Sequence, residues 1–145
     1  MGDKVTTRIE GLQALQRDLQ SFPEKIAKRV TGRAVRKALA PVEAEAKARC
    51  PVETGASKDA IKVRPGKRRP GIQSAVVGAS KKWFTGDNFY IAFNEFGHFM
   101  GRRKRRKFYP PHPFLRPAYD AKGQEAVEIA TEELKAGIER ELKKQ

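Results

Sequence analysis

The residues of this chain that could support catalysis or metal binding are few and far apart. Its only histidines are His98 and His112, and its only cysteine is Cys50, which precedes a proline at the expected end of a helix. A zinc site needs three or four ligands at suitable spacing, and these residues do not provide them. The segment PGKRRPG also lacks the spacing and the hydroxyl residue of a phosphate-binding loop. We therefore expect no enzyme, no metal, no cofactor and no small-molecule substrate.

The sequence favours electrostatic binding instead. Lys and Arg number 31 against 17 Asp and Glu, a formal net charge of +14. Residues 60–86 contain seven basic side chains and no acidic one, and residues 102–107 are all basic. Such an excess indicates a polyanionic partner, either nucleic acid or an acidic protein surface, although charge runs are often simply solvated. The candidate docking or DNA-facing residues are Arg64, Lys67, Arg68, Arg69, Arg102, Arg103, Lys104, Arg105, Arg106 and Lys107.

Hydrophobic periodicity predicts the helices that position these cations. Leucines at 12, 15 and 19 predict a short amphipathic helix that ends near residue 22. Over residues 23–49 an apolar residue recurs at every fourth position from Ile26 to Ala46, and Pro41 within this pattern predicts a kink or a split. A last helix is expected over residues 114–142. Its apolar stripe is Val127, Ala130, Leu134, Ile138 and Leu142.

Between the helices we expect strands and long loops. Strands are predicted at residues 61–64, 72–77 and 89–96, with a turn at 86–88, a further edge strand at 4–10 and loops at 65–71 and 97–113. Phe93 and Phe96 alternate poorly, so at least one of them should be exposed. The prediction is a single α+β domain over residues 1–145. Two long helices, one kinked near Pro41, pack on a small antiparallel sheet of three or four strands and carry long basic loops.

The chain has no apolar stretch long enough to cross a membrane and no export signal. A lone cysteine excludes an intramolecular disulfide. We therefore expect no membrane partner and folding in a reducing cytoplasm.

Two sequence blocks carry a family resemblance. PVETG follows the long helix and precedes DAIKV, whereas FNEFG, a variable loop and PHPFLRPAYDA lead into the last helix. In this order they resemble the tail-completion, or neck, proteins of long-tailed bacteriophages. That family is typified by a component of the Hong Kong 97 phage and is similar to the lambda-type minor tail protein Z. The motif positions, which the resemblance makes structural, are Pro51, Thr54, Gly55, Glu95, Phe96, Gly97, Pro113, Phe114, Leu115, Arg116 and Pro117.

The resemblance implies a structural virion protein of the head–tail junction that is assembled in the host cytoplasm. It implies a ring, expected to be six-fold, that lies against neighbouring connector and tail proteins. Genomic DNA in the lumen is an open question. Duplex DNA carries about one negative charge per 1.7 Å, so six copies of the 102–107 run would exceed the phosphates inside the ring. Part of the run is therefore expected to face an acidic neighbouring ring. The alternative is a cytoplasmic, non-specific nucleic-acid-binding protein, which the net charge favours although no recognition module is evident.

Overall fold

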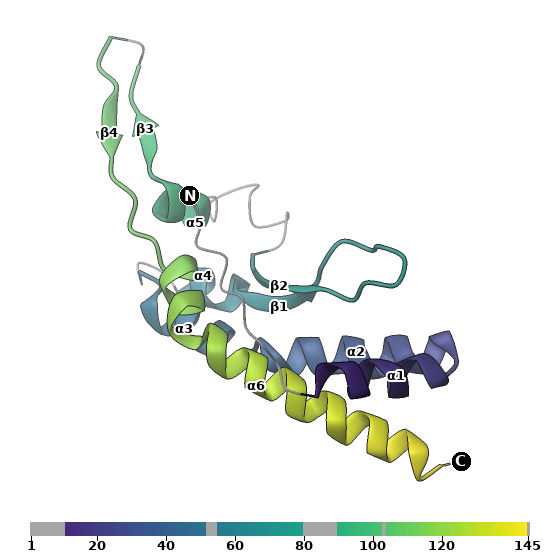
Figure 1. Cartoon of the computed structure of the whole chain (residues 1–145). Coiled ribbons are helices and arrows are strands. Elements are labelled where there is room, and N and C mark those ends of the chain that lie inside the picture. The colour runs from purple at the N-terminus through teal and green to yellow at the C-terminus, as the bar shows by residue number, and fades with distance from the viewer. Residues whose placement is uncertain (1–10, 52–54, 80–89, 103, 145) are drawn as a thin grey trace.

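The computed structural model describes residues 11–51, 55–79, 90–102 and 104–144, and it has a mixed helix and sheet architecture (Figure 1). The helices and strands follow one another in the order α1 (Leu12–Ser21), α2 (Glu24–Ala38), α3 (Ala40–Arg49), α4 (Gly55–Ala60), β1 (Lys62–Pro65), β2 (Ala75–Gly78), α5 (Tyr90–Phe96), β3 (His98–Met100), β4 (Lys107–Tyr109) and α6 (Leu115–Leu142).

The long helix α6 runs antiparallel to α2 and α3 and packs along both of them (Figure 1). The predicted apolar stripe, which repeats every four residues, forms this contact, since Val30, Ala34, Ala38, Val42 and Ala46 are all buried. Small side chains let the helices approach closely, which favours packing over a long contact. The stripe predicted on α6 is confirmed at Ile138, but Leu142 lies in the last turn and is half exposed.

The predicted interruption at Pro41 is confirmed as a split. Helix α2 ends at Ala38 and α3 begins at Ala40, so Pro41 lies in the first turn of α3. The amide hydrogen that proline lacks would have no partner within the helix at that position, so the residue is tolerated there. Because α3 continues the buried stripe of α2, the two helices still present one surface to α6.

The sheet differs from the prediction of three or four strands. The described residues form two separate antiparallel pairs, β1 with β2 and β3 with β4. The third predicted strand is wrong where it is described, because residues 90–96 form helix α5. Strand preference depends strongly on the surroundings, and here the tertiary contacts favour a helix. The edge strand at 4–10 and the turn at 86–88 lie outside the described residues.

The helical layer is joined to β1 by a carboxylate. Oε2 of Glu43 in α3 accepts a hydrogen bond of 2.8 Å from the backbone N–H of Val63, and Oε1 pairs with Lys47 one turn later. Burial alone would raise the pKa of Glu43. The hydrogen bond and charge of Lys47 and the N–H of Val63 outweigh burial, so the pKa lies below its ordinary value.

Candidate functional site

The first group of candidate cations lies on the hairpin that joins β1 to β2. The predicted loop is an ordered turn, because the N–H of Gly66 donates to the carbonyl of Ser74 at 2.8 Å and the N–H of Ile72 donates to that of Arg69 at 3.2 Å. Arg64 is half buried, and its Nε donates to the carbonyl of Gly78 at 3.3 Å. Arg64 therefore braces the sheet in part, whereas the cations of the turn are exposed.

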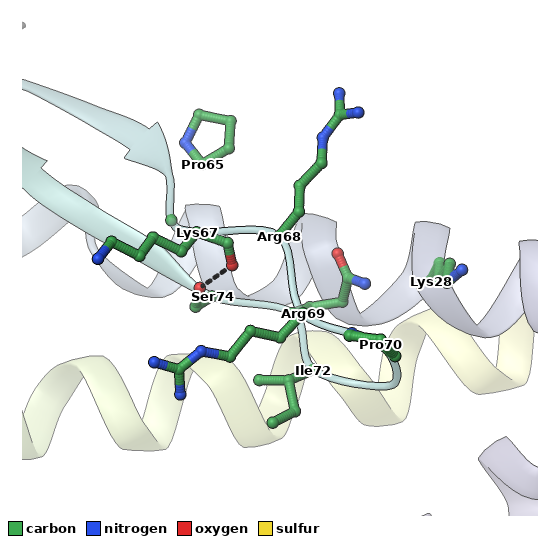
Figure 2. A pocket seen from close by; sticks show the side chains of 10 residues that line it. Lys28, Pro65, Lys67, Arg68, Arg69, Pro70, Ile72 and Ser74 are labelled. Carbon is green, nitrogen blue, oxygen red and sulfur yellow. Dashed lines mark hydrogen bonds between the residues drawn. The ribbon is translucent and has the colours of Figure 1, made fainter.

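These cations do not form a compact anion site. They border a cavity of about 520 Å³ between the turn and α2, to which Lys28 also contributes. Figure 2 shows that the side chains of Lys67, Arg68 and Arg69 leave the turn in different directions instead of meeting at one point. A small anion needs donors that converge on it, whereas an extended polyanion or an acidic protein face needs only a broad positive surface. The arrangement therefore suits an extended polyanion or an acidic protein face.

The second group lies on a hairpin where a loop was predicted. Strands β3 and β4 and their connection, residues 98–109, project from the body of the protein, and we call this segment the arm (Figure 1). The N–H of Arg105 donates to the carbonyl of Arg102 at 2.7 Å and closes the tip. The described candidate cations of the arm are all exposed: Arg102, Lys104, Arg105, Arg106 and Lys107. Arg103 lies outside the described residues.

The arm also exposes apolar side chains. Phe99 and Phe108 are cross-strand neighbours whose ring centroids lie 4.9 Å apart, and their exposed fractions are 66% and 50%. Phe96, at the end of α5, is 79% exposed, which confirms the prediction that at least one of Phe93 and Phe96 faces solvent. Exposed aromatic residues beside cations are typical of protein contact surfaces.

The base of the arm is fixed by Glu95, which caps a helix distant from it in sequence. Its Oε2 accepts hydrogen bonds from the N–H groups of Phe114 (2.9 Å) and Leu115 (3.0 Å), and its Oε1 accepts one from Arg116 (3.1 Å). Helix α6 has no side-chain cap at its own N-cap position. Pro117 has no amide hydrogen to satisfy, and the N–H of Ala118 already bonds the carbonyl of Phe114. Glu95 therefore completes the hydrogen bonding of this helix end.

Gly97 ends helix α5 and turns the chain into the arm. Its N–H donates to the carbonyl of Phe93 at 2.8 Å, and its φ of 72° is the left-handed conformation typical of a helix C-cap. A Cβ at this position would lie 2.9 Å from the carbonyl oxygen of Tyr109. Glycine is therefore required at this position both by its conformation and by the close approach of β4.

His98 packs into the base of the arm. Its ring stacks between those of Phe93 and Tyr109, with centroid distances of 4.4 and 5.2 Å. Both ring nitrogens are buried and have no hydrogen-bond partner among the described residues. The same part of the chain contains no group of histidine, cysteine and carboxylate side chains able to hold a metal. Its stacking identifies His98 as a packing residue.

The remaining motif positions have varied surroundings. Phe114 is buried with Ile61, Cys50 and Ala118, and Leu115 packs against the same cluster. Burial raises the pKa of the Cys50 thiol, and the charge of Lys58 opposes this only in part. Thr54 lies outside the described residues. Gly55 begins α4, while Pro51, Pro113 and Arg116 are exposed, as Phe96 is.

The structure thus brings together residues that the sequence analysis treated as separate motifs. FNEFG and PHPFLRP meet through the carboxylate of Glu95 and through a hydrogen bond of 2.6 Å from the N–H of His112 to the carbonyl of Asn94. The two basic hairpins are not brought together, since they lie at different places on the protein (Figure 1). No described helix has the length and apolar character needed to span a membrane.

Comparison with known proteins gives a family match. A family model described as "Bacteriophage HK97-gp10, putative tail-component" matches residues 13–97. The matched range extends from α1 through α5 to Gly97 and covers more than half of the chain, and it ends where the arm begins. No curated protein and no solved structure matches the chain.

Proposed function

The chain belongs to the HK97-gp10-like family of phage tail components, and from this we propose that it is a structural subunit of the junction between head and tail. In this proposal, copies assemble as a ring, expected to be six-fold, at the head-proximal end of the tail. The observation that carries the proposal is the family match over residues 13–97. The protein is assembled in the host cytoplasm and is then located in the virion. It acts there by binding to other subunits.

The two basic hairpins support a role as a connecting subunit. The turn with Lys67, Arg68 and Arg69 and the arm lie at different places on the protein, so each can contact a different neighbour. The exposed rings of Phe99 and Phe108 give the arm an apolar surface that a protein neighbour would cover. The neighbours that this geometry suits are the connector, a tail protein and further copies of the chain itself.

Removal of the protein from assembling phage tests the proposal. We expect lysates of a phage with the gene deleted to contain DNA-filled heads and separate tails, visible by electron microscopy. Supplying the protein in trans should restore infectious particles that contain it. If particles without the protein are complete and infectious, it is not a component of the junction.

The arm is tested in the same complementation assay. Replacing residues 102–107 by Ser and Gly should leave heads and tails unjoined. A matched control replaces Lys25 and Arg36, which are exposed cations of α2, by Ser, and it should complement fully. If the arm variant joins heads to tails as well as the wild type does, these cations are merely solvated.

The alternative function, non-specific binding of nucleic acid, is favoured by the exposed cations of both hairpins. Against it, part of the charge of basic helix α2 is used internally. Arg29 pairs with Glu141 at 2.9 Å, and Lys37 pairs with Glu133 at 2.7 Å. A nucleic-acid-binding protein should bind free duplex with an affinity that falls steeply with salt. A junction subunit should instead bind duplex weakly and sediment with purified virions.

A further inference from the structure

Helix α6 carries an acidic stripe on its outward face. Glu125, Glu128, Glu132 and Glu139 are all exposed, and their spacing of three, four and seven residues places them on one face of the helix. The stripe is about 21 Å long, because an α-helix rises about 1.5 Å per residue. In a chain with a formal net charge of +14, such a surface is an exception.

The stripe is poorly neutralised within one copy. The cations of α2 pair with other acidic residues of α6, namely Glu133 and Glu141. Glu125 pairs with Lys122 of its own helix at 2.8 Å, and the exposed Lys135 and Lys143 lie on the same face, four residues to either side of Glu139. Glu128, Glu132 and Glu139 nevertheless have no ion-pair partner among the described residues, so these three carboxylates can pair with another molecule.

The arm has the opposite charge and cannot reach this face in its own copy. Residues 96–119 contain no acidic side chain, and the described cations of the tip are exposed. Figure 1 shows that the arm leaves the body near the start of α6 and leads away from the rest of that helix. The contact that the charges favour is therefore one between two copies.

We infer that the arm of one copy lies along the outward face of α6 in a second copy, with the tip cations against the acidic stripe. Each copy then uses its arm on one side and its stripe on the other, which makes the contact head-to-tail. Contacts of this kind close into a ring when the rotation between subunits allows it. The inference rests on the proposed function and specifies the contact that would build the ring.

The observations favour a second copy over DNA as the occupant of the arm. Phosphates would neutralise the cations but would leave Phe99 and Phe108 exposed and would be repelled by the stripe of any adjacent copy. The side chains of a helix can cover these rings while its glutamates meet the tip. Both halves of the contact are present in this one chain.

Charge reversal tests the contact. The arm variant replaces the described cations Arg102, Lys104, Arg105, Arg106 and Lys107 by Glu, which makes the run 102–107 net negative. The stripe variant is Glu128→Lys, Glu132→Lys and Glu139→Lys. In sedimentation experiments, the wild type should self-associate more weakly as salt is raised, and each variant alone should associate about tenfold more weakly or worse, since several exposed ion pairs become repulsive. Circular dichroism should show that both variants remain folded.

Combining the two reversals gives the decisive result. A mixture of arm and stripe variants should associate like the wild type, because each reversed surface then meets one of opposite charge. A single chain that carries both reversals should also recover. The matched control, Lys25→Glu with Arg36→Glu on α2, alters exposed cations outside the contact and should behave as the wild type does.

The outcomes separate this inference from the function on which it rests. If the arm variant self-associates as strongly as the wild type, if the mixture fails to recover, or if the wild type remains a monomer, the inference is wrong. Loss of duplex binding by the arm variant, with its assembly unchanged, would assign the cations to DNA and also overturn it. In each case the complementation assay reports independently whether the protein joins heads to tails.

Discussion

Replacing Glu95 by alanine should destabilise the protein although no side chain of the core is altered. The carboxylate accepts three backbone hydrogen bonds of 2.9–3.1 Å from the start of α6, and it is the only acceptor there that comes from another helix among the described residues. In the variant, the N–H groups of Phe114, Leu115 and Arg116 lose this carboxylate as their hydrogen-bond acceptor. Water can reach Arg116, but Phe114 is 99% buried.

Two effects determine the magnitude. Loss of a helix N-cap costs about 0.5–2 kcal/mol, and a carboxylate near the positive end of a helix contributes about 0.3–1 kcal/mol. We therefore expect Glu95→Ala to lower the free energy of unfolding by about 2 kcal/mol. For a domain of this size such a loss lowers the melting temperature by roughly 4–8 °C. Glu95→Gln keeps one acceptor oxygen but loses the charge, so its free energy of unfolding should lie between those of Glu95→Ala and the wild type.

Denaturant unfolding with hydrogen exchange provides the assay. The free energy of unfolding should fall, and the amides of residues 114–116 should exchange faster than in the wild type. Glu139→Ala is the matched control, since this glutamate of α6 is exposed and should change the free energy by less than about 0.5 kcal/mol. An unchanged stability together with unchanged exchange at residues 114–116 would refute the role assigned to Glu95.

Three further predictions follow from the packing and the titrating groups. Gly137→Ala should lower the free energy of unfolding by about 1–3 kcal/mol, because its Cβ would lie 2.7 Å from Cγ1 of Val30. Thermal unfolding measures this loss, which Val30→Ala in the same chain should reduce. The pKa of Glu43 is lowered on folding, so its contribution to stability is present above pH 4.5 and is lost as the pH falls through the lowered pKa. Glu43→Gln should accordingly be less stable than the wild type at pH 7, and urea unfolding should show this gap narrowing below about pH 4.5. Cys50 is buried and its pKa is raised, so a thiol reagent should modify it slowly at pH 8 and rapidly after unfolding.

Helices α1, α2, α3 and α6 could be predicted from the sequence because their signals are local. The apolar stripe from Ile26 to Ala46 repeats over several turns, and Pro41 can be placed without strain only where one helix ends and the next begins. The last helix was found in the same way, to within one residue at its start. Periodicity shows which face of a helix is apolar but not where the helix stops packing against the rest of the protein. Leu142 was therefore predicted to be in the buried stripe although it is exposed.

Helix α5 and the arm could not be predicted because distant contacts determine them. Residues 90–96 are rich in side chains that favour strands, yet they form a helix whose Glu95 caps α6 from 19–21 residues away in sequence. One local signal was available, since Gly97 is suited to ending a helix. The cations of residues 102–107 stood out in the sequence, but the flanking strands β3 and β4 have only three residues each. Strands this short show no recognisable alternation of apolar and polar residues.

The base of the arm has a consequence for assembly if copies join as inferred. Glu95 and Gly97 fix the arm to the first turn of the helix whose later turns carry the acidic stripe. The angle between arm and stripe within one copy then determines the rotation from each subunit to the next, and with it the number of copies that close a ring. The cations attract the neighbouring subunit over a distance, but they do not determine the angle at which it binds. In a ring built by the inferred contact, Glu95 and Gly97 would therefore set the copy number. We expect Glu95→Ala to give rings of mixed size by native mass spectrometry, and a single unchanged size would contradict this.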